Sequence, residues 1–95
     1  IEDVLASPRR ALLLSILAER KRPVALGDLV RATLAREEGV PPAAISGEAV
    51  TEARIEAYER HLPKLTAIDA VTFDSQRCTV ELTDDRIAAQ VTRIE

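Results

Sequence analysis

The clearest pattern of apolar and polar positions lies between residues 51 and 82. Over residues 51–65, apolar side chains recur every three or four positions, as on one face of a helix. After Leu65 the period changes to two, as in strands that bury one face. The helical stripe consists of Ile55, Tyr58, Leu62 and Leu65, and the alternating positions are Val71, Phe73, Cys78, Val80 and Leu82. This pattern predicts a helix that leads directly into a β-hairpin.

The alternation also predicts the register of the hairpin. Pairing Phe73 with Cys78 leaves residues 74–77 as a four-residue turn. The same register places Val71 opposite Val80, and all the apolar side chains then share one face of the hairpin. Cys78 is therefore expected to lie inward beside Phe73, as a small buried hydrophobic residue.

Two more helices and a short strand are predicted upstream. Ser7 followed by Pro8 is typical of an N-cap and a first helical position, and the helix should continue to about residue 20. Pro23 ends it, because the residue before a proline is pushed towards extended geometry. Residues 24–26 are then expected to form a short strand, which needs the hairpin as its pairing partner.

A second helix is expected over residues 27–36. Residues 37–47 contain two of the three glycines and two prolines, so this stretch is expected to be irregular. The inward side chains of the second helix are expected to be Leu29, Val30, Thr33 and Leu34.

The last twelve residues, 84–95, are predicted to form a C-terminal helix that begins with two acids. A helix of this length is marginal alone, so its apolar stripe must bury against the body or a second copy. The apolar surface of the first helix is also wider than one core needs. The apolar stripe of residues 84–95 and the wide apolar surface of the first helix together predict a homodimer. The predicted interface contains Leu12, Ile16, Ile87, Val91 and Ile94.

Two segments resemble known winged-helix regulators. The first helix carries the pattern Pro-x-Arg-x-x-Ile-Leu-x-x-Leu of bacterial and archaeal regulators, at Pro8, Arg10, Leu13, Leu14 and Leu17. His61-Leu62-Pro63-Lys64-Leu65, followed by Ala67-Ile68-Asp69-Ala70-Val71, is similar to the end of the recognition helix in small prokaryotic regulators of the ArsR and MarR type. The HLPKL form in particular resembles a haloarchaeal winged-helix family of largely unassigned function. Asp69 stands where those families usually have Gly, and Asp enters the left-handed region at modest cost.

The resemblance implies an α+β fold that is mostly α. It would be a winged helix-turn-helix with a three-helix core, a small antiparallel sheet with a wing hairpin, and an added C-terminal helix. Residues 1–95 would form a single domain, with the core at 7–83 and the dimerisation helix at 84–95. The implied function is DNA binding by a cytoplasmic transcriptional regulator that acts as a dimer.

With the apolar stripe turned inward, Arg54, His61 and Lys64 fall on a neighbouring outward stripe of the predicted recognition helix. In DNA-binding winged helices, such residues reach base edges and phosphates. His61 is expected to be half-exposed and polar. The predicted DNA-binding residues are Arg54, Arg60, His61, Lys64 and Arg77, the last at the tip of the wing.

The alternative is a solvated helix face on which acids neutralise the bases. Glu52, Glu56 and Glu59 interleave with the basic residues, and Glu56 with Arg60 has the favourable i, i+4 order. Pro63 also lies inside this helix, where it removes a backbone hydrogen bond and crowds a carbonyl one turn earlier. Either a kink or a local packing feature is therefore expected there.

Composition narrows the function further. The net charge of the 95 residues is −3, which argues against nucleic-acid binding by bulk charge, so any contact needs a local patch. The alternative class is a protein-interaction or dimerisation module that does not bind DNA. The long stretch 37–47 favours this alternative, since a compact helix-turn-helix uses a turn of only about three or four residues.

The sequence does not indicate a disulfide, a metal site, a catalytic site or a membrane-spanning segment. The single cysteine rules out an internal disulfide and suits a reducing compartment. His61 has no Cys, His or acidic partners at metal-ligand spacing, so no metal is expected. The sequence contains no nucleophile elbow or phosphate-binding glycine loop, and we expect no catalytic residue, cofactor or small-molecule ligand. No apolar run approaches the roughly 20 residues of a membrane span, and no signal peptide is expected.

Overall fold

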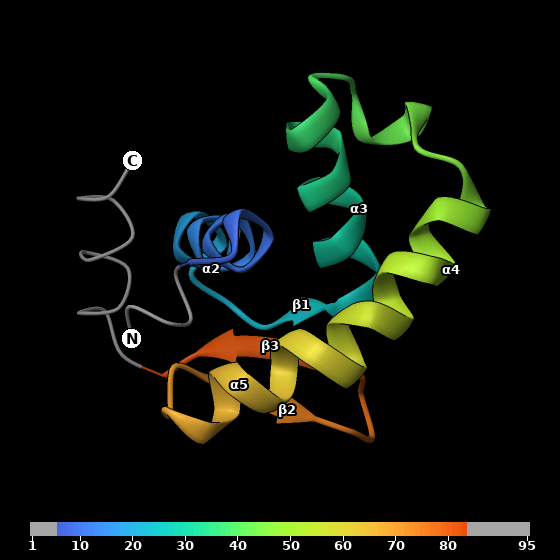
Figure 1. Cartoon of the computed structure of the whole chain (residues 1–95). Helices are drawn as coiled ribbons and strands as arrows, with labels where there is room; N and C mark the ends of the chain where they lie inside the picture. Colours follow the sequence, from blue (N-terminus) through green and yellow to red (C-terminus); the bar gives the residue numbers. More distant parts are fainter. Residues whose placement is uncertain (1–5, 84–95) are drawn as a thin grey trace.

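The structure, a computed structural model, describes residues 6–83. It is mostly helical and contains a small three-stranded antiparallel sheet, so the expected α+β class is confirmed (Figure 1). The helix that follows the irregular stretch is divided by a π-helical turn (Ala57–His61), and a 3₁₀ turn (Pro42–Ala44) precedes it. The other elements are α2 (Pro8–Arg20), β1 (Val24–Ala25), α3 (Leu26–Glu38), α4 (Gly47–Glu56), α5 (Leu62–Ala67), β2 (Val71–Asp74) and β3 (Thr79–Leu82).

The first helix begins and ends as the sequence predicts. The Ser7 hydroxyl accepts a hydrogen bond from the backbone N–H of Arg10 at 3.4 Å, and Pro8 occupies the first turn. This cap satisfies one of the N–H groups that a helix start leaves without a partner. The second helix begins slightly earlier than expected, at Leu26, and ends at Gly39 in the left-handed region with a φ of 68°.

The sheet has the strand order β1-β3-β2, so the short β1 strand pairs with the hairpin as expected. The predicted hairpin register is wrong by two residues, because Phe73 pairs with Val80 and not with Cys78. A shift of two keeps the side chains of the paired residues on their original faces, so Val71 and Val80 remain buried.

The turn explains the register. The Asp74 carboxylate accepts hydrogen bonds from the backbone N–H groups of Gln76 and Arg77 at 3.0 and 3.2 Å, which closes the chain just after β2. Cys78 then adopts a left-handed conformation with a φ of 55° and ends the turn. Its side chain is exposed, so the expectation of a buried Cys78 is wrong.

A single continuous helix, the α4–α5 helix (residues 47–67), carries the expected recognition segment. It starts at Gly47, where the Ser46 hydroxyl accepts a hydrogen bond from the Ala49 N–H at 3.1 Å. It ends at Ala67, and Asp69, two residues further on, adopts the left-handed region with a φ of 57°. The N–H of Asp69 bonds to the Thr66 carbonyl and that of Ala70 to the Leu65 carbonyl, the hydrogen-bond pair of a Schellman cap.

The predicted inward stripe of this helix is half wrong. Leu62 and Leu65 are buried as expected, but Ile55 and Tyr58 are 52% and 58% exposed. The helix instead buries small side chains, among them Ala53 and Ala57, which allow it to approach the core closely. The Tyr58 ring packs edge-to-face with the half-buried ring of Phe73 on the hairpin, with 5.8 Å between the ring centroids.

The π-helical turn accommodates Pro63. The N–H of Leu62 bonds to the carbonyl of Ala57, five residues earlier, so the turn contains one extra residue. A proline has no N–H and crowds the carbonyl one turn before it, and the wider turn just upstream relieves that crowding. The expected local feature at Pro63 is therefore a π-helical turn.

One hydrophobic cluster joins the α-helices, the π-helical turn and the three strands, and α3 packs between α2 and α4 (Figure 1). The four expected inward residues of α3 are buried. Ile16 is fully buried in this cluster, so its expected place in a dimer interface is wrong, whereas Leu12 is partly exposed. The other three expected interface residues, Ile87, Val91 and Ile94, lie outside the described residues. Within residues 6–83, no helix combines the length and apolar character that crossing a bilayer requires.

Candidate functional site

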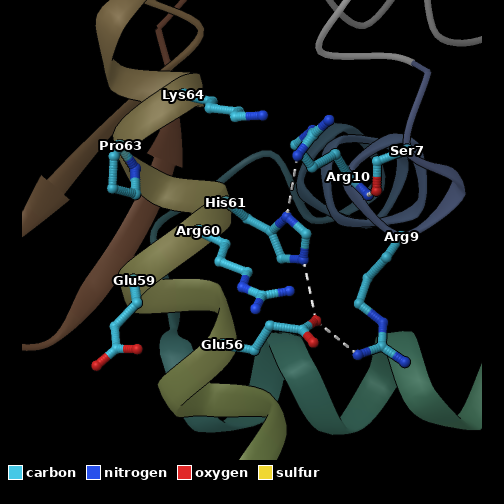
Figure 2. A pocket seen from close by; sticks show the side chains of 9 residues that line it. All are labelled: Ser7, Arg9, Arg10, Glu56, Glu59, Arg60, His61, Pro63 and Lys64. Atoms are coloured by element: carbon cyan, nitrogen blue, oxygen red, sulfur yellow. Dashed lines mark hydrogen bonds and ion pairs between the residues drawn. The ribbon is translucent and has the colours of Figure 1, made fainter.

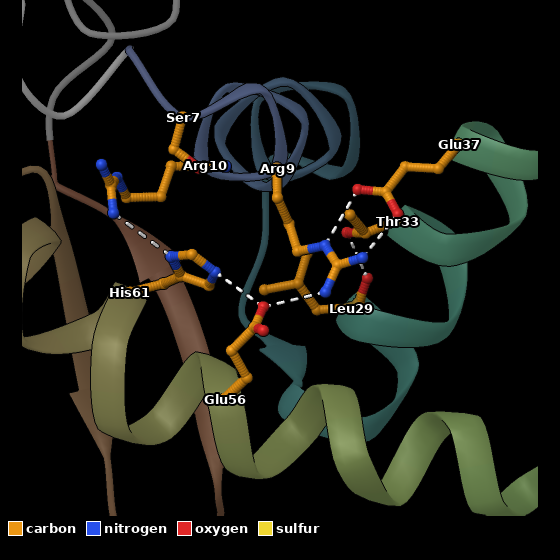
Figure 3. Close-up of polar contacts among 8 residues, drawn as sticks. All are labelled: Ser7, Arg9, Arg10, Leu29, Thr33, Glu37, Glu56 and His61. Carbon is orange, nitrogen blue, oxygen red and sulfur yellow. Dashed lines mark hydrogen bonds and ion pairs between the residues drawn. The ribbon is translucent and has the colours of Figure 1, made fainter.

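The α4–α5 helix presents three exposed basic side chains, Arg54, Arg60 and Lys64. Within the described part of the chain, none of the three forms an ion pair. In particular, Glu56 does not pair with Arg60 as the i, i+4 spacing suggests. Glu56 points instead towards α2, where it accepts hydrogen bonds from other side chains (Figure 3).

Two surface hollows flank this helix. The hollow towards α2, called here the α2 hollow, has a volume of about 630 Å³ and its lining includes Arg9, Arg10, Glu56, Arg60, His61 and Lys64. The second hollow, towards the hairpin, has a volume of about 270 Å³ and is lined by Leu26, Arg54, Ile55, Tyr58, Glu59 and Cys78. Glu59 lines both hollows, so it lies on the ridge between them. The bases are therefore divided between the two flanks of the helix.

Arg9 connects three helices beneath the α2 hollow. Its guanidinium donates two hydrogen bonds to the Glu37 carboxylate on α3, at 2.8 and 2.9 Å, and one to Glu56 on α4 at 2.8 Å (Figure 3). The hydrogen bonds that Arg9 donates to the Glu37 carboxylate raise the pKa of Arg9, and the charge of Glu56 adds to this effect. Arg9 is thus a structural cation that ties α2 to α3 and α4.

His61 is buried, with only 6% of its surface exposed, so the expectation of a half-exposed residue available to DNA is wrong. Arg10 extends from α2 and places its Nη1 atom 3.5 Å from His61 Nδ1. A guanidinium only donates, so Nδ1 is the acceptor and the ring proton lies on Nε2. Nε2 then donates to the Glu56 carboxylate at 3.1 Å. The π-helical turn, which ends at His61, contains one extra residue. The His61 side chain points into the protein and not outward as expected.

Burial lowers the pKa of His61, and the neighbouring Arg10 and Arg9 act in the same direction against the opposing pull of Glu56. The imidazole is therefore neutral at physiological pH. For Glu56, burial by itself would raise the pKa, but the hydrogen bonds from His61 and Arg9 outweigh it and the pKa is lowered. Glu56 is a carboxylate shared between a neutral histidine and an arginine.

The structure separates the predicted site residues. Arg60 and Lys64 lie together at the α2 hollow, whereas Arg54 lies on the opposite flank, beside the hairpin. Arg77 is exposed in the hairpin turn. Sequence reasoning missed Arg9 and the role of Glu56, because 47 residues separate them and no periodic pattern relates them. The described residues contain no group of three His, Cys, Asp or Glu side chains that could hold a metal ion.

These features define a small, mostly helical α+β domain with a three-stranded antiparallel sheet and a polar network between its first helix and the α4–α5 helix. The chain belongs to the family described as a domain of unknown function (DUF7344), which it matches over residues 2–81. No curated protein and no solved structure matches the chain.

Proposed function

We propose that the chain is a winged-helix protein that binds duplex DNA and regulates transcription as a dimer, with the α4–α5 helix as recognition helix and the β2–β3 hairpin as wing. The element order supports this proposal, since three helices with a strand after the first precede a hairpin that pairs with that strand. The observation that carries it is the set of exposed bases, without ion pairs to described residues, on both flanks of one helix.

The presence of basic side chains on both flanks of the α4–α5 helix suits a helix that lies in the major groove. An α-helix with its side chains is about 10–12 Å wide, and the groove is about 12 Å wide. Basic side chains on opposite flanks of the helix can then reach phosphates of opposite DNA strands. Arg60 and Lys64 would contact one strand and Arg54 the other. Glu59 on the ridge between them, and the exposed Ile55 beside it, would then face the base edges. A glutamate can accept from the cytosine amino group, and an apolar side chain can contact the thymine methyl.

Replacing Arg60 and Lys64 together by Ala tests this proposal. We expect the double variant to lose retardation of duplex DNA at low salt while its melting temperature stays close to that of the wild type, since both side chains are exposed. Each lost phosphate contact should reduce the slope of log K against log salt by about 0.9.

The matched control replaces Lys21 and Arg22, two exposed bases between α2 and β1, by Ala. This variant has the same net charge as the first and should bind DNA as the wild type does. Equal binding by the Arg60, Lys64 variant and the wild type would refute the assignment of the recognition helix.

A second candidate function, docking to another protein, is favoured by a different observation. The outer face of the α4–α5 helix exposes Ile55 and Tyr58, and the exposed acids Glu52 and Glu59 lie on the same helix. Exposed apolar side chains are enriched at protein interfaces, and acids on this face repel phosphates. If the wild type binds no genomic fragment at low salt, the docking function replaces DNA binding.

A further inference from the structure

We infer that Tyr58 is a positioning residue that couples the β2–β3 hairpin to the α4–α5 helix, so that Arg77 in the hairpin turn contacts a DNA phosphate together with that helix. This inference rests on the proposed DNA binding, in which the hairpin is the wing. The chain contains one tyrosine, one phenylalanine and no tryptophan, and its two aromatic side chains contact each other. The rings of Tyr58 and Phe73 meet edge-to-face, at an interplanar angle of 71°.

The aromatic pair lies at the surface and not within the core. The buried residues of the hydrophobic cluster are all Leu, Ile, Val or Ala. Phe73 packs half-buried against this cluster, and Tyr58 remains 58% exposed. An aromatic pair of this geometry stabilises the contact between its two elements, by about a two- to tenfold change in an equilibrium constant beyond the effect of buried area. The pair therefore joins the helix to the hairpin at the surface of the molecule.

The hairpin is otherwise joined to the α4–α5 helix mainly through α5, which packs on β2. Further towards α4, the hollow of about 270 Å³ lies between the helix and the hairpin, with Tyr58 on one wall and Cys78 on the other. Figure 2 shows the opposite flank of the helix, where Arg60 and Lys64 extend towards α2. Tyr58 is thus placed on the hairpin flank, beside a space that core side chains do not fill.

The turn of the hairpin is held at both of its ends. At the β2 end, Phe73 contacts Tyr58 directly before the turn. At the β3 end, the Cys78 carbonyl accepts a hydrogen bond at 2.9 Å from the N–H of Leu26, the first residue of α3. The Asp74 carboxylate closes the turn between these two contacts. Of the two contacts, only the one made by Tyr58 links the turn to the α4–α5 helix.

This link determines where Arg77 can reach. Arg77 is exposed in the turn and forms no ion pair with a described residue. Without the Tyr58 ring, the turn would stay attached to α3 but not to the recognition helix. Ordering a mobile segment on binding costs conformational entropy, so a turn that is already held contacts phosphate more favourably. Tyr58 therefore supports the wing contact without touching DNA itself.

Nuclear magnetic resonance tests the coupling without DNA. Tyr58→Ala should lower the heteronuclear NOE values of the amides of residues 74–78, which report picosecond to nanosecond motion, and should shift the Phe73 ring resonances. The melting temperature should stay close to that of the wild type, since Tyr58 is more than half exposed. Tyr58→Phe keeps the ring and should behave as the wild type.

The matched control for the hairpin measurement is Ile55→Ala. It removes an apolar side chain of similar exposure, 52%, from the same helix and beside the same hollow, and it should leave the hairpin amides unchanged. Hairpin amides that are equally ordered in Tyr58→Ala and in the wild type would overturn the inference whatever DNA does.

The salt dependence of duplex DNA binding gives a readout that a purely structural role of Tyr58 would not change. Each phosphate contact contributes about 0.9 to the slope of log K against log salt. A phenol carries no charge at neutral pH, yet Tyr58→Ala should reduce the slope by about 0.9, as Arg77→Ala should. The double variant should reduce the slope no further than either single variant, and Tyr58→Phe should restore it.

The outcomes separate this inference from the proposed function. A slope that is unchanged in either single variant would overturn the inference and leave the proposed DNA binding in place. Absence of duplex binding by the wild type at low salt would refute the proposed function and the wing contact with it. The order of the hairpin amides in Tyr58→Ala would still decide whether Tyr58 couples the two elements.

Discussion

At the scale of single residues, His61 departs most from what its neighbours in sequence suggest. It directly follows the exposed polar residues Glu59 and Arg60, yet the structure buries it between Glu56 and Arg10. Hydrophobic periodicity did not predict that His61 is buried. His61 belongs to a buried stripe with Ala53 and Ala57, each four residues apart, and this stripe is recognised only when alanines are counted as apolar. Small residues give a weak hydrophobic signal. The larger side chains of Ile55 and Tyr58 dominated the periodic pattern, although both are exposed.

The buried His61 makes stability depend on pH. Its pKa in the folded protein lies below the ordinary value of 6.5, so the unfolded chain takes up a proton first as pH falls. The free energy of unfolding should therefore decrease as pH falls below about 6.5, and it should decrease again below about 4.5 as the lowered pKa of Glu56 becomes important. Urea unfolding at a series of pH values measures both changes.

His61→Gln is the control for this prediction. His61 is the single histidine of the chain, so the variant should lose the decrease between about pH 7 and pH 5. It should keep the change at lower pH, because the hydrogen bond from Arg9 still holds Glu56. An unchanged profile in this variant would mean that another group causes the decrease.

At the scale of elements, the orientation of the α4–α5 helix decides which side chains are structural. Leu65 and Ile55 occupy the same expected stripe, but Leu65 is 1% exposed and Ile55 is 52% exposed. Leu65→Ala should lower the free energy of unfolding by about 2–5 kcal/mol through lost burial and a cavity. Ile55→Ala should change it by less than about 0.5 kcal/mol, as at other surface positions.

Chemical denaturation of the two variants beside the wild type distinguishes the orientations. Equal losses in both would mean that the helix is turned as the periodicity suggests, with Ile55 in the core. A loss in Leu65→Ala alone supports the orientation with the small alanines inward. The orientation also decides which of the predicted DNA contacts are available, because it buries His61 and leaves Arg54, Arg60 and Lys64 exposed.

At the scale of the whole molecule, the remaining expectation is the homodimer. Residues 84–95 lie outside the described residues, and their sequence carries the stripe Ile87, Val91 and Ile94. Light scattering should give a dimer for the intact chain and a monomer after truncation following Thr83. Leu12→Ser should weaken the dimer less, since Leu12 is only partly exposed. A monomer for the intact chain would contradict the prediction.

The sequence by itself determined the features that depend on local chemistry. The Ser7 and Pro8 start of α2, the buried face of α3 and the left-handed residue at Asp69 all follow from side-chain geometry within one turn. The alternation in the hairpin likewise determined which side chains face inward, because the strand period is two.

Only the tertiary structure decided what depends on contacts between distant segments. The hairpin register was set by the Asp74 turn and by pairing with β1, since alternation alone cannot distinguish registers two residues apart. The α4–α5 helix has an orientation different from the one that periodicity predicts, because the small side chains of Ala53 and Ala57 allow it to approach the core closely. The network of Arg9, Glu56 and His61 joins α2 to the α4–α5 helix, and the charges that meet there are set by packing and not by spacing along the chain.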